Sequence, residues 1–221
     1  SKSQLELVKG LELPDEAFLE LADYSRSIGT EFLSTAFDVE ALEFLDQLDL
    51  GYIKIPSGDI TNLPLLEEIG KRKKKVIMST GMATLDEVRA ALDVLLSHGT
   101  SQQHVTVLQC TTQYPTPDAD INLAAMVTLG RELDLSYGLS DHSEGPLACI
   151  GAAALGATIL EKHVTLDRQM AGPDHKASME MPEFRKMCAD IRRMRTMLGT
   201  SEKIVTESDR TNITVARKSI V

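Results

Sequence analysis

Long apolar runs are missing from this 221-residue chain. No stretch approaches the roughly 18 apolar residues that cross a bilayer, and no basic segment leads into an apolar one at the start. With 43% hydrophobic residues and no long polar tract, the chain has enough apolar side chains for one sizeable core. We therefore expect one domain of a cytoplasmic protein with no membrane partner.

Cysteine is scarce as well. The chain has three cysteines, Cys110, Cys149 and Cys188, and none of them belongs to a C-x-x-C spacing. An odd number without that spacing favours neither a disulfide framework nor a zinc site. We expect reduced thiols.

Positive charge is in deficit. The formal net charge of −10 argues against nucleic acid as a partner, because such binding depends on clustered lysine and arginine. The one basic run, "KRKKK" at 71–75, lies where a predicted helix ends, and cations there complement the helix dipole. A binding patch is the alternative interpretation of this run. If the substrate is an anion, its positive partners must be local ones.

Two common nucleotide-binding motifs are also absent: no Gly-x-Gly-x-x-Gly follows a predicted strand, and there is no P-loop. What is present is an alternation of short β-branched runs and amphipathic stretches, which is typical of a parallel sheet. Strands are predicted at 31–37, 52–57, 75–80, 105–112, 135–140 and 158–163. Helices are predicted at 14–27, 38–47, 63–71, 84–97 and 182–198.

Local signals mark the ends of these helices. Thr84 and Glu87 have the spacing of a capping box at a helix start. Gly29, Gly99 and Gly199 follow three of the helices, where a left-handed C-terminal cap is expected.

The alternation predicts an α/β fold of the TIM (β/α)8-barrel type, in which loops at the C-terminal ends of the strands build the site. Side chains capable of chemistry occur at the end of every predicted strand. A closed barrel needs eight strands in about 250 residues. We therefore expect an incomplete barrel over residues 1–200, with about six βα units and without the first two. Residues 201–221 close on "NITVARKSIV", an apolar run with no helix after it, and are predicted to begin a linker.

Two histidines occupy equivalent places in this pattern. His142 and His163 each lie just past the end of a predicted strand, so in a barrel both rings would face one mouth. A single histidine is more often structural, but the pair makes a divalent-metal site an equal alternative. Two imidazoles with open positions suit Mn²⁺ or a similar ion. Asp59 is the nearest acid to complete the set or to orient a metal-bound water, and an exposed loop carboxylate is the alternative.

One lysine lies among hydroxyl groups at the strand ends. Lys54 is inside a predicted strand, where burial requires a bound anion or a carboxylate, and a permanent salt bridge is the alternative. Singly, each hydroxyl can bond a backbone carbonyl, but as a set around one ammonium they form a socket for phosphate. The hydroxyl groups belong to Thr35, Ser57, Ser79, Thr112 and Ser140.

The loop at 165–179 follows the last predicted strand and is rich in glycine, proline and charge. It is either a solvated connection or a lid over the mouth of the barrel. Tyr114, in "TTQYPTP", overhangs the same mouth after the fourth predicted strand.

Six segments of the chain, taken in order, resemble the N-acetylneuraminate (sialic acid) synthase family. They are "KIPSGDITNLPLL", "MSTGMATLDEV", "QCTTQYPTP", "GLSDHSEG", "ILEKHVTLD" and "GPDHKASM". The closing "VARKSIV" is similar to the family's link to its next domain. The resemblance implies a (β/α)8 barrel followed by a small antifreeze-like (SAF) domain in a swapped homodimer. The small domain and the first strands have no counterpart in this chain.

The resemblance also implies a reaction. Family members condense phosphoenolpyruvate with N-acetylmannosamine or a related 2-acetamido sugar, and with water, to give a nine-carbon 2-keto acid and phosphate. By resemblance, His142 and His163 hold Mn²⁺, or another divalent ion such as Mg²⁺ or Co²⁺, which polarises the sugar aldehyde. Asp59 matches the acid that orients or deprotonates the water, and these three residues are the implied catalytic set. The diacetamido precursor of legionaminic acid is an alternative sugar.

Substrate contacts are implied in the same way. The residues that match contacts to phosphoenolpyruvate are Thr35, Lys54, Ser57, Ser79, Thr112 and Ser140, and those that match contacts to the amino sugar are Tyr114 and Asp174. Thr112 stands where some members carry asparagine. The family's first-strand carboxylate, second-strand lysine and capping-domain arginine have no position here, so we expect the 221 residues alone to be inactive. The alternative to an enzyme is a non-catalytic polysaccharide-biosynthesis barrel of the same fold.

Overall fold

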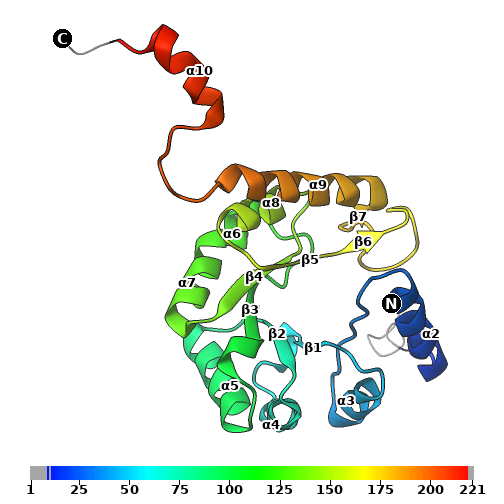
Figure 1. Ribbon diagram of the computed structural model, residues 1–221. Helices are drawn as coiled ribbons and strands as arrows, with labels where there is room; N and C mark the ends of the chain where they lie inside the picture. Colours follow the sequence, from blue (N-terminus) through cyan, green and yellow to red (C-terminus); the bar gives the residue numbers. More distant parts are fainter. Residues whose placement is uncertain (1–8, 10, 219–221) are drawn as a thin grey trace.

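A five-stranded parallel sheet forms the centre of the protein in the computed structural model, which describes residues 9 and 11–218 (Figure 1). The strands are β1 (Tyr52–Ile55), β2 (Lys75–Ser79), β3 (Val105–Cys110), β4 (Ser136–Asp141) and β5 (Ile159–Lys162). Their order in the sheet follows the sequence, and each pairs in parallel with its neighbour. All five carboxyl ends therefore lie along one edge.

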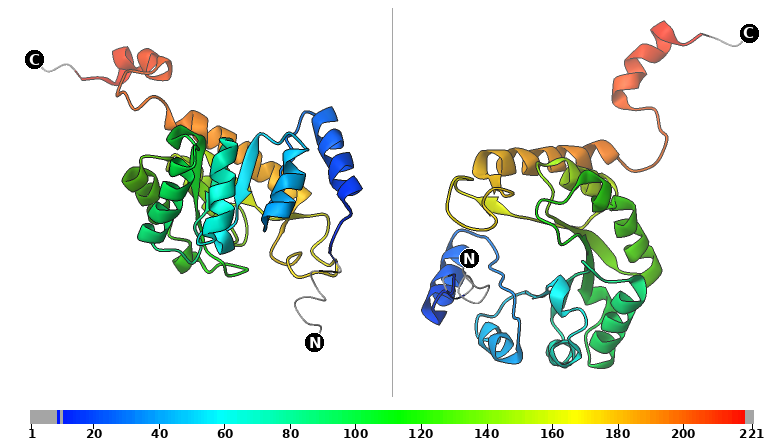
Figure 2. Two further views of the ribbon diagram at one scale, coloured as in Figure 1. Left: turned by 90° about the horizontal axis from the view of Figure 1, so that it is seen from below. Right: turned by 180° about the vertical axis from the view of Figure 1, so that it is seen from behind.

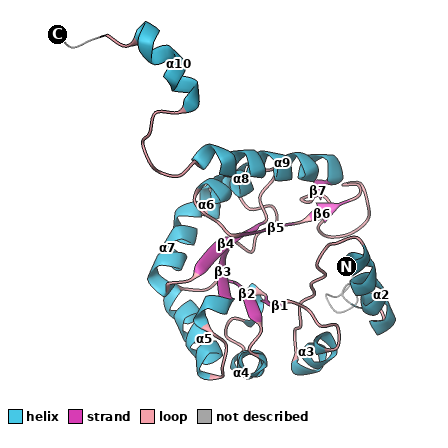
Figure 3. Ribbon diagram, in the orientation of Figure 1, coloured by secondary structure: helices cyan, strands magenta, loops and turns pink. Residues whose placement is uncertain are grey.

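Helices lie outside the curved sheet, on its convex face (Figures 1 and 3). They are α3 (Val39–Asp46), α4 (Leu63–Arg72), α5 (Leu85–Ser97), α6 (Asp118–Ile121), α7 (Leu123–Leu133), α8 (Leu147–Ala154) and α9 (Met181–Leu198). Two 3-10 turns, η1 (Ser57–Asp59) and η2 (Gln102–His104), complete the connections. This arrangement confirms the prediction of an incomplete (β/α)8-type barrel.

Four further elements lie beside the curved sheet. Helix α2 (Asp15–Ser27) stands across a gap from the short strands β6 (Val164–Thr165) and β7 (Met179–Glu180), which pair with each other. Helix α10 (Glu207–Ala216) extends away from the rest of the molecule (Figure 2). Within the described residues, no helix is both long and apolar enough to cross a membrane.

Five of the six predicted strands form, and the first one, at 31–37, does not. The stretch 31–37 contributes one parallel bridge, between Thr35 and Lys54, instead of a strand. The extended segment ends at Asp38, which caps α3 by accepting from the backbone N–H of Ala41 at 2.7 Å.

The predicted helices are confirmed, and Thr84 and Glu87 form the capping box of α5. Gly29 and Gly99 have positive φ as expected, whereas Gly199 combines a positive φ with a ψ of −149° and is not a left-handed helical cap. The closing run "NITVARKSIV" is itself helical as far as Ala216, because Thr206 begins α10 with a capping box of its own. Its last three residues, 219–221, lie outside the described residues, as do residues 1–8 and 10 of the predicted barrel segment.

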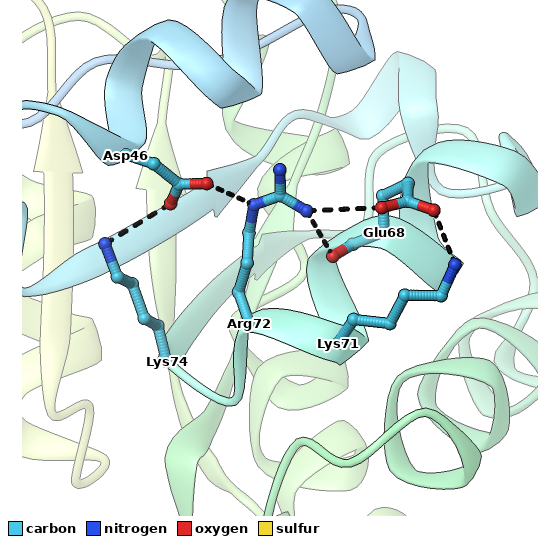
Figure 4. Close-up of polar contacts among 5 residues, drawn as sticks. All are labelled: Asp46, Glu68, Lys71, Arg72 and Lys74. Atoms are coloured by element: carbon cyan, nitrogen blue, oxygen red, sulfur yellow. Dashed lines mark hydrogen bonds and ion pairs between the residues drawn. The ribbon is translucent and has the colours of Figure 1, made fainter.

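The basic run at 71–75 is largely neutralised within the protein (Figure 4). Arg72 donates to the carboxylate of Asp46 at 2.6 Å, and Lys74 lies 3.4 Å from the same group. Lys71 pairs with Glu68 at 2.5 Å. These contacts join the end of α4 to the end of α3, which agrees with a structural role for the run.

The core lies between the sheet and these helices. On α4, Leu65, Leu66 and Ile69 are almost fully buried against it, whereas Leu63 at the first turn is 51% exposed. The helix therefore offers a matched pair of leucines for testing how it packs.

We expect Leu66→Ala to lower the free energy of unfolding by about 2–5 kcal/mol, because it leaves a cavity in the core. Leu63→Ala should cost less than about 1 kcal/mol, since its side chain is half exposed. Chemical denaturation of both variants measures the difference. Equal losses would show that α4 does not pack as described.

Candidate active site

A cavity of about 360 Å³ opens at the carboxyl edge of the sheet. It is lined by side chains from every strand of the sheet or from the loops that follow. Nine of the eleven predicted site residues line it: Thr35, Lys54, Ser57, Ser79, Thr112, Tyr114, Ser140, His142 and His163. Pro56, Gly58, Met82, Cys110 and Glu161 complete the lining.

A larger hollow of about 740 Å³ lies between α2 and α3. Its charged lining is entirely acidic, from Glu12, Asp15, Asp38, Glu40 and Glu43. Such a surface repels an anionic substrate, so we place the candidate active site at the sheet edge, where Lys54 and the two histidines lie.

Lys54 lies at the floor of the cavity and is 7% exposed. Its Nζ donates to Ser79 Oγ at 2.8 Å and to the backbone carbonyl of Ile55 at 3.3 Å, and it lies 3.6 Å from Glu161 Oε2. Glu161 in turn accepts from Ser140 Oγ at 2.5 Å. The buried ammonium thus has a carboxylate neighbour, but at a distance longer than a direct hydrogen bond.

The loop after β2 packs closely against its neighbours in the cavity wall. The backbone N–H of Gly81 donates to Ser57 Oγ at 2.9 Å. A Cβ at position 81 would lie 2.7 Å from Thr112 Cγ2 and 2.8 Å from Ser57 Oγ. Glycine therefore allows three strand-end segments to meet at this point.

The two histidines lie together beneath Tyr114. The rings of His142 and His163 are 5.2 Å apart and nearly perpendicular, at 89°. The ring of Tyr114 stacks on His142 with centroids 4.0 Å apart and meets His163 edge-on at 5.3 Å. Nδ1 of His142 lies 2.7 Å from the carbonyl oxygen of Thr111. Because a carbonyl only accepts, Nδ1 carries the proton, and the lone pair of Nε2 is free.

The pair of imidazoles is the donor set available for a metal. Among the described residues, no group of three or more His, Cys, Asp and Glu side chains is placed to hold an ion. With only two imidazole donors, a divalent ion here would have to take its remaining ligands from water or substrate.

Two ionisable groups of the site are shifted by their surroundings. Burial, together with the neighbouring Cys110, Asp174 and Glu161, raises the pKa of Tyr114 to about 12. Burial and the neighbouring His142 lower the pKa of His163. At neutral pH the tyrosine is a hydrogen-bond donor and the His163 ring is neutral, the form in which imidazole binds metals.

Asp59 and Asp174 are the two predicted site residues that do not line the cavity. Asp59 ends the 3-10 turn η1, and its carboxylate accepts from the side-chain amide of Asn62 at 3.0 Å. Asp174, on the loop between β6 and β7, approaches Nδ1 of His163 to 3.9 Å and is half exposed. That loop therefore reaches the edge of the cavity.

A buried ion pair lies on the opposite face of the same strands. Lys162 Nζ donates to Asp141 Oδ2 at 2.8 Å, and the two side chains are only 2% and 1% exposed. Oδ1 of Asp141 accepts from both the backbone N–H and the hydroxyl of Ser143, at 2.8 and 2.6 Å. Asp141 therefore supports the turn after β4.

The sequence places Glu161 among the strand-end side chains capable of chemistry but assigns it no role, and it gives no indication of Lys162. A signal for Glu161 was available, because side chains alternate along a strand and position 161 must share a face with His163. Lys162 carried no such signal, since its partner Asp141 is 21 residues away.

A model of the NeuB family matches residues 1–203 of the chain. An N,N'-diacetyllegionaminic acid synthase from Campylobacter jejuni is 46% identical over the whole chain and 66% of its own length. A synthase of the same name from Legionella pneumophila is 40% identical over the whole chain and 62% of its length. The chain thus spans slightly less than two thirds of these relatives.

A crystal structure of N-acetylneuraminic acid (sialic acid) synthetase from Leptospira borgpetersenii, in complex with citrate, is similar as well. The sequence identity is 33%, and the TM-score is 0.87 over 96% of this chain and 75% of the other. The likeness extends over nearly all of the curved sheet and its helices.

The two lysines at the sheet edge should respond oppositely to replacement by methionine. Lys162→Met leaves the fully buried Asp141 without a counter-ion and should cost about 3–5 kcal/mol of unfolding free energy. Lys54→Met removes a buried charge whose neighbour Glu161 is 40% exposed and open to water, so stability should stay level or rise. Thermal and denaturant unfolding of both variants measures this. A loss for Lys54→Met as large as for Lys162→Met would contradict the described environments.

Proposed function

Because this chain belongs to the NeuB family, we propose that it is the barrel part of a synthase that condenses phosphoenolpyruvate with an N-acylated amino sugar, releasing phosphate. One observation carries the proposal. A buried lysine surrounded by hydroxyl groups, and a pair of histidines, share a single cavity at the carboxyl edge of the sheet. The first group suits a phosphorylated anion, and the second suits a divalent metal.

The hydroxyl groups of Ser57 and Ser79 can donate a hydrogen bond to a bound phosphate. Ser79 Oγ accepts from Lys54, and Ser57 Oγ accepts from the N–H of Gly81. Each hydroxyl has one proton, which these contacts leave free to point into the cavity. Together with the ammonium they would hold a phosphate and stabilise the charge that develops on its departing oxygen.

The carboxylate of Glu161 contacts both Lys54 and Ser140 in the structure, and the substrate would have to displace it. An incoming anion competes with its carboxylate for the same two donors. The side chain is 40% exposed, so it can turn towards water. Exchange of one counter-ion for another keeps Lys54 neutralised throughout, which avoids an unpaired buried charge.

The amino sugar would bind at the histidine end of the cavity. A divalent ion held by His142 and His163 would supply a Lewis acid for the sugar carbonyl. Tyr114, which stays protonated at neutral pH, can donate to a sugar oxygen, and Asp174 can accept from its hydroxyls. Asp59 remains proposed as the residue that orients the water, a role for which its carboxylate must reach the cavity that it does not line.

Among the possible sugars, a diacetamido sugar of the legionaminic type is favoured. The relatives that are 46% and 40% identical over the whole chain are both named for N,N'-diacetyllegionaminic acid. N-acetylmannosamine is the alternative, because the solved structure with 33% identity is a sialic acid synthetase.

The test is phosphate release by the full-length gene product, given phosphoenolpyruvate and Mn²⁺ with each sugar in parallel. We expect release that depends on both the metal and a sugar, and faster release with the diacetamido sugar. Omission of the sugar is the control. No release with either sugar, from folded protein that binds Mn²⁺, would contradict the proposal and favour a non-catalytic barrel.

Gly81→Ala tests the anion site itself. The added methyl would push Ser57 and Thr112 apart, and we expect the affinity for phosphoenolpyruvate to fall about tenfold or more, because a small misplacement of a positioning group is costly. Gly58→Ala is the matched control in the same lining, since a Cβ there meets nothing within 4 Å. Calorimetric titration with phosphoenolpyruvate measures both. If the two variants bind equally well, Ser57 and Thr112 do not belong to the phosphate site.

A further inference from the structure

We propose that the buried Asp141–Lys162 ion pair is a positioning device for His142 and His163. Each member of the pair directly precedes one of the two histidines in the sequence. The two residues are also direct neighbours in the β4–β5 register, and their side chains are joined at 2.8 Å. Neither side chain lines the cavity, so the pair acts through the residues beside it.

The alternation of side chains along a strand explains why this location matters. On β4 and just beyond it, Ser140 and His142 flank Asp141 and face the cavity; on β5, Glu161 and His163 flank Lys162 in the same way. A shift of either strand by one residue would turn that strand's two side chains away from the cavity. An ion pair at the central position opposes such a shift, because it would separate two buried charges.

The pair also fixes the turn that carries His142. Asp141 accepts two hydrogen bonds from Ser143, and Lys162 Nζ donates to the carbonyl of Ser143. His142 lies between Asp141 and Ser143 in the sequence, and its Nδ1 donates to the carbonyl of Thr111, in the loop after β3. With its backbone held on both sides, His142 presents Nε2 to the cavity in one orientation.

The ion pair is enclosed on the side away from the cavity. Its outer side is covered by α8, where the thiol of Cys149 donates to Asp141 Oδ2 at 3.3 Å and is itself fully buried. Burial and the charge of Asp141 raise the pKa of that thiol, so it stays protonated. A pair of apolar residues could fill the same space and would lose the acceptor of the Ser143 N–H and hydroxyl. An apolar pair would make no directional hydrogen bonds, and such bonds are what fix the orientation of the two histidines.

The test separates positioning from stability with three variants of the full-length gene product. Lys162→Met breaks the pair. Asp141→Leu with Lys162→Met replaces it by apolar side chains, which should restore much of the melting temperature that the single variant loses. Lys186→Met is the matched control, because Lys186 pairs with Asp190 on the exposed face of α9.

Two measurements are made on each variant. The first is the affinity for Mn²⁺ alone, by titration followed with electron paramagnetic resonance. We expect a loss of about tenfold or more in the single and the double variant, the range seen when groups that orient metal ligands are removed, and no change in Lys186→Met. The second is the tautomer of His142 in metal-free protein, from the ¹⁵N spectrum of labelled histidine assigned with His142→Gln. The Nδ1–H form should dominate in the parent and give way to a mixture in the double variant.

A folded double variant with the parent's Mn²⁺ affinity and the parent's tautomer would overturn the inference. If the double variant does not fold, Ser143→Ala removes one donor to Asp141 at smaller cost and should shift both measurements in the same direction. The metal measurement rests on the proposed function, whereas the tautomer does not. If the parent protein binds no Mn²⁺, the metal assignment fails, and the tautomer alone decides whether the pair positions His142.

Discussion

The parallel register of β1 to β5 is the constraint on which the rest of this structure depends. Parallel strands that follow one another in sequence need a helix to cover each crossover, and this places the helices on the convex face. The same register brings five carboxyl ends to one edge. Lys54, Ser79, Ser140 and the two histidines are far apart in the sequence, and they meet at one cavity because the backbone ladder brings them there.

The two buried lysines show how one sheet uses charge for two purposes. Lys54 faces the cavity, and its carboxylate neighbour is loosely placed and partly exposed, so an anion can compete for it. Lys162 faces α8, and its partner is buried, directly bonded and further tied to the turn after β4. The difference lies in the exposure and distance of the partner, which decides whether a buried ammonium is available for binding or committed to structure.

Much of the fold follows from sequence pattern. Hydrophobic periodicity and capping residues located β1 to β5 and helices α2, α3, α4, α5 and α9. The stretch 31–37 has strand composition, but it forms only one bridge, and a single-sequence pattern does not report how many partners a strand finds. Strand-end positions likewise indicated most of the cavity lining. The ion pairs of Glu161 and Lys162 depend on register between strands, which the spacing of residues within one strand cannot reveal.

A crystal structure of the full-length gene product with phosphoenolpyruvate and Mn²⁺ would show whether Lys54 and its hydroxyl neighbours hold the phosphate. We expect phosphate oxygens within hydrogen-bond distance of Lys54 Nζ and Ser79 Oγ, with the carboxylate of Glu161 displaced from both Lys54 and Ser140. Phosphoenolpyruvate bound elsewhere, or bound while Glu161 still contacts Lys54 and Ser140, would contradict this proposal.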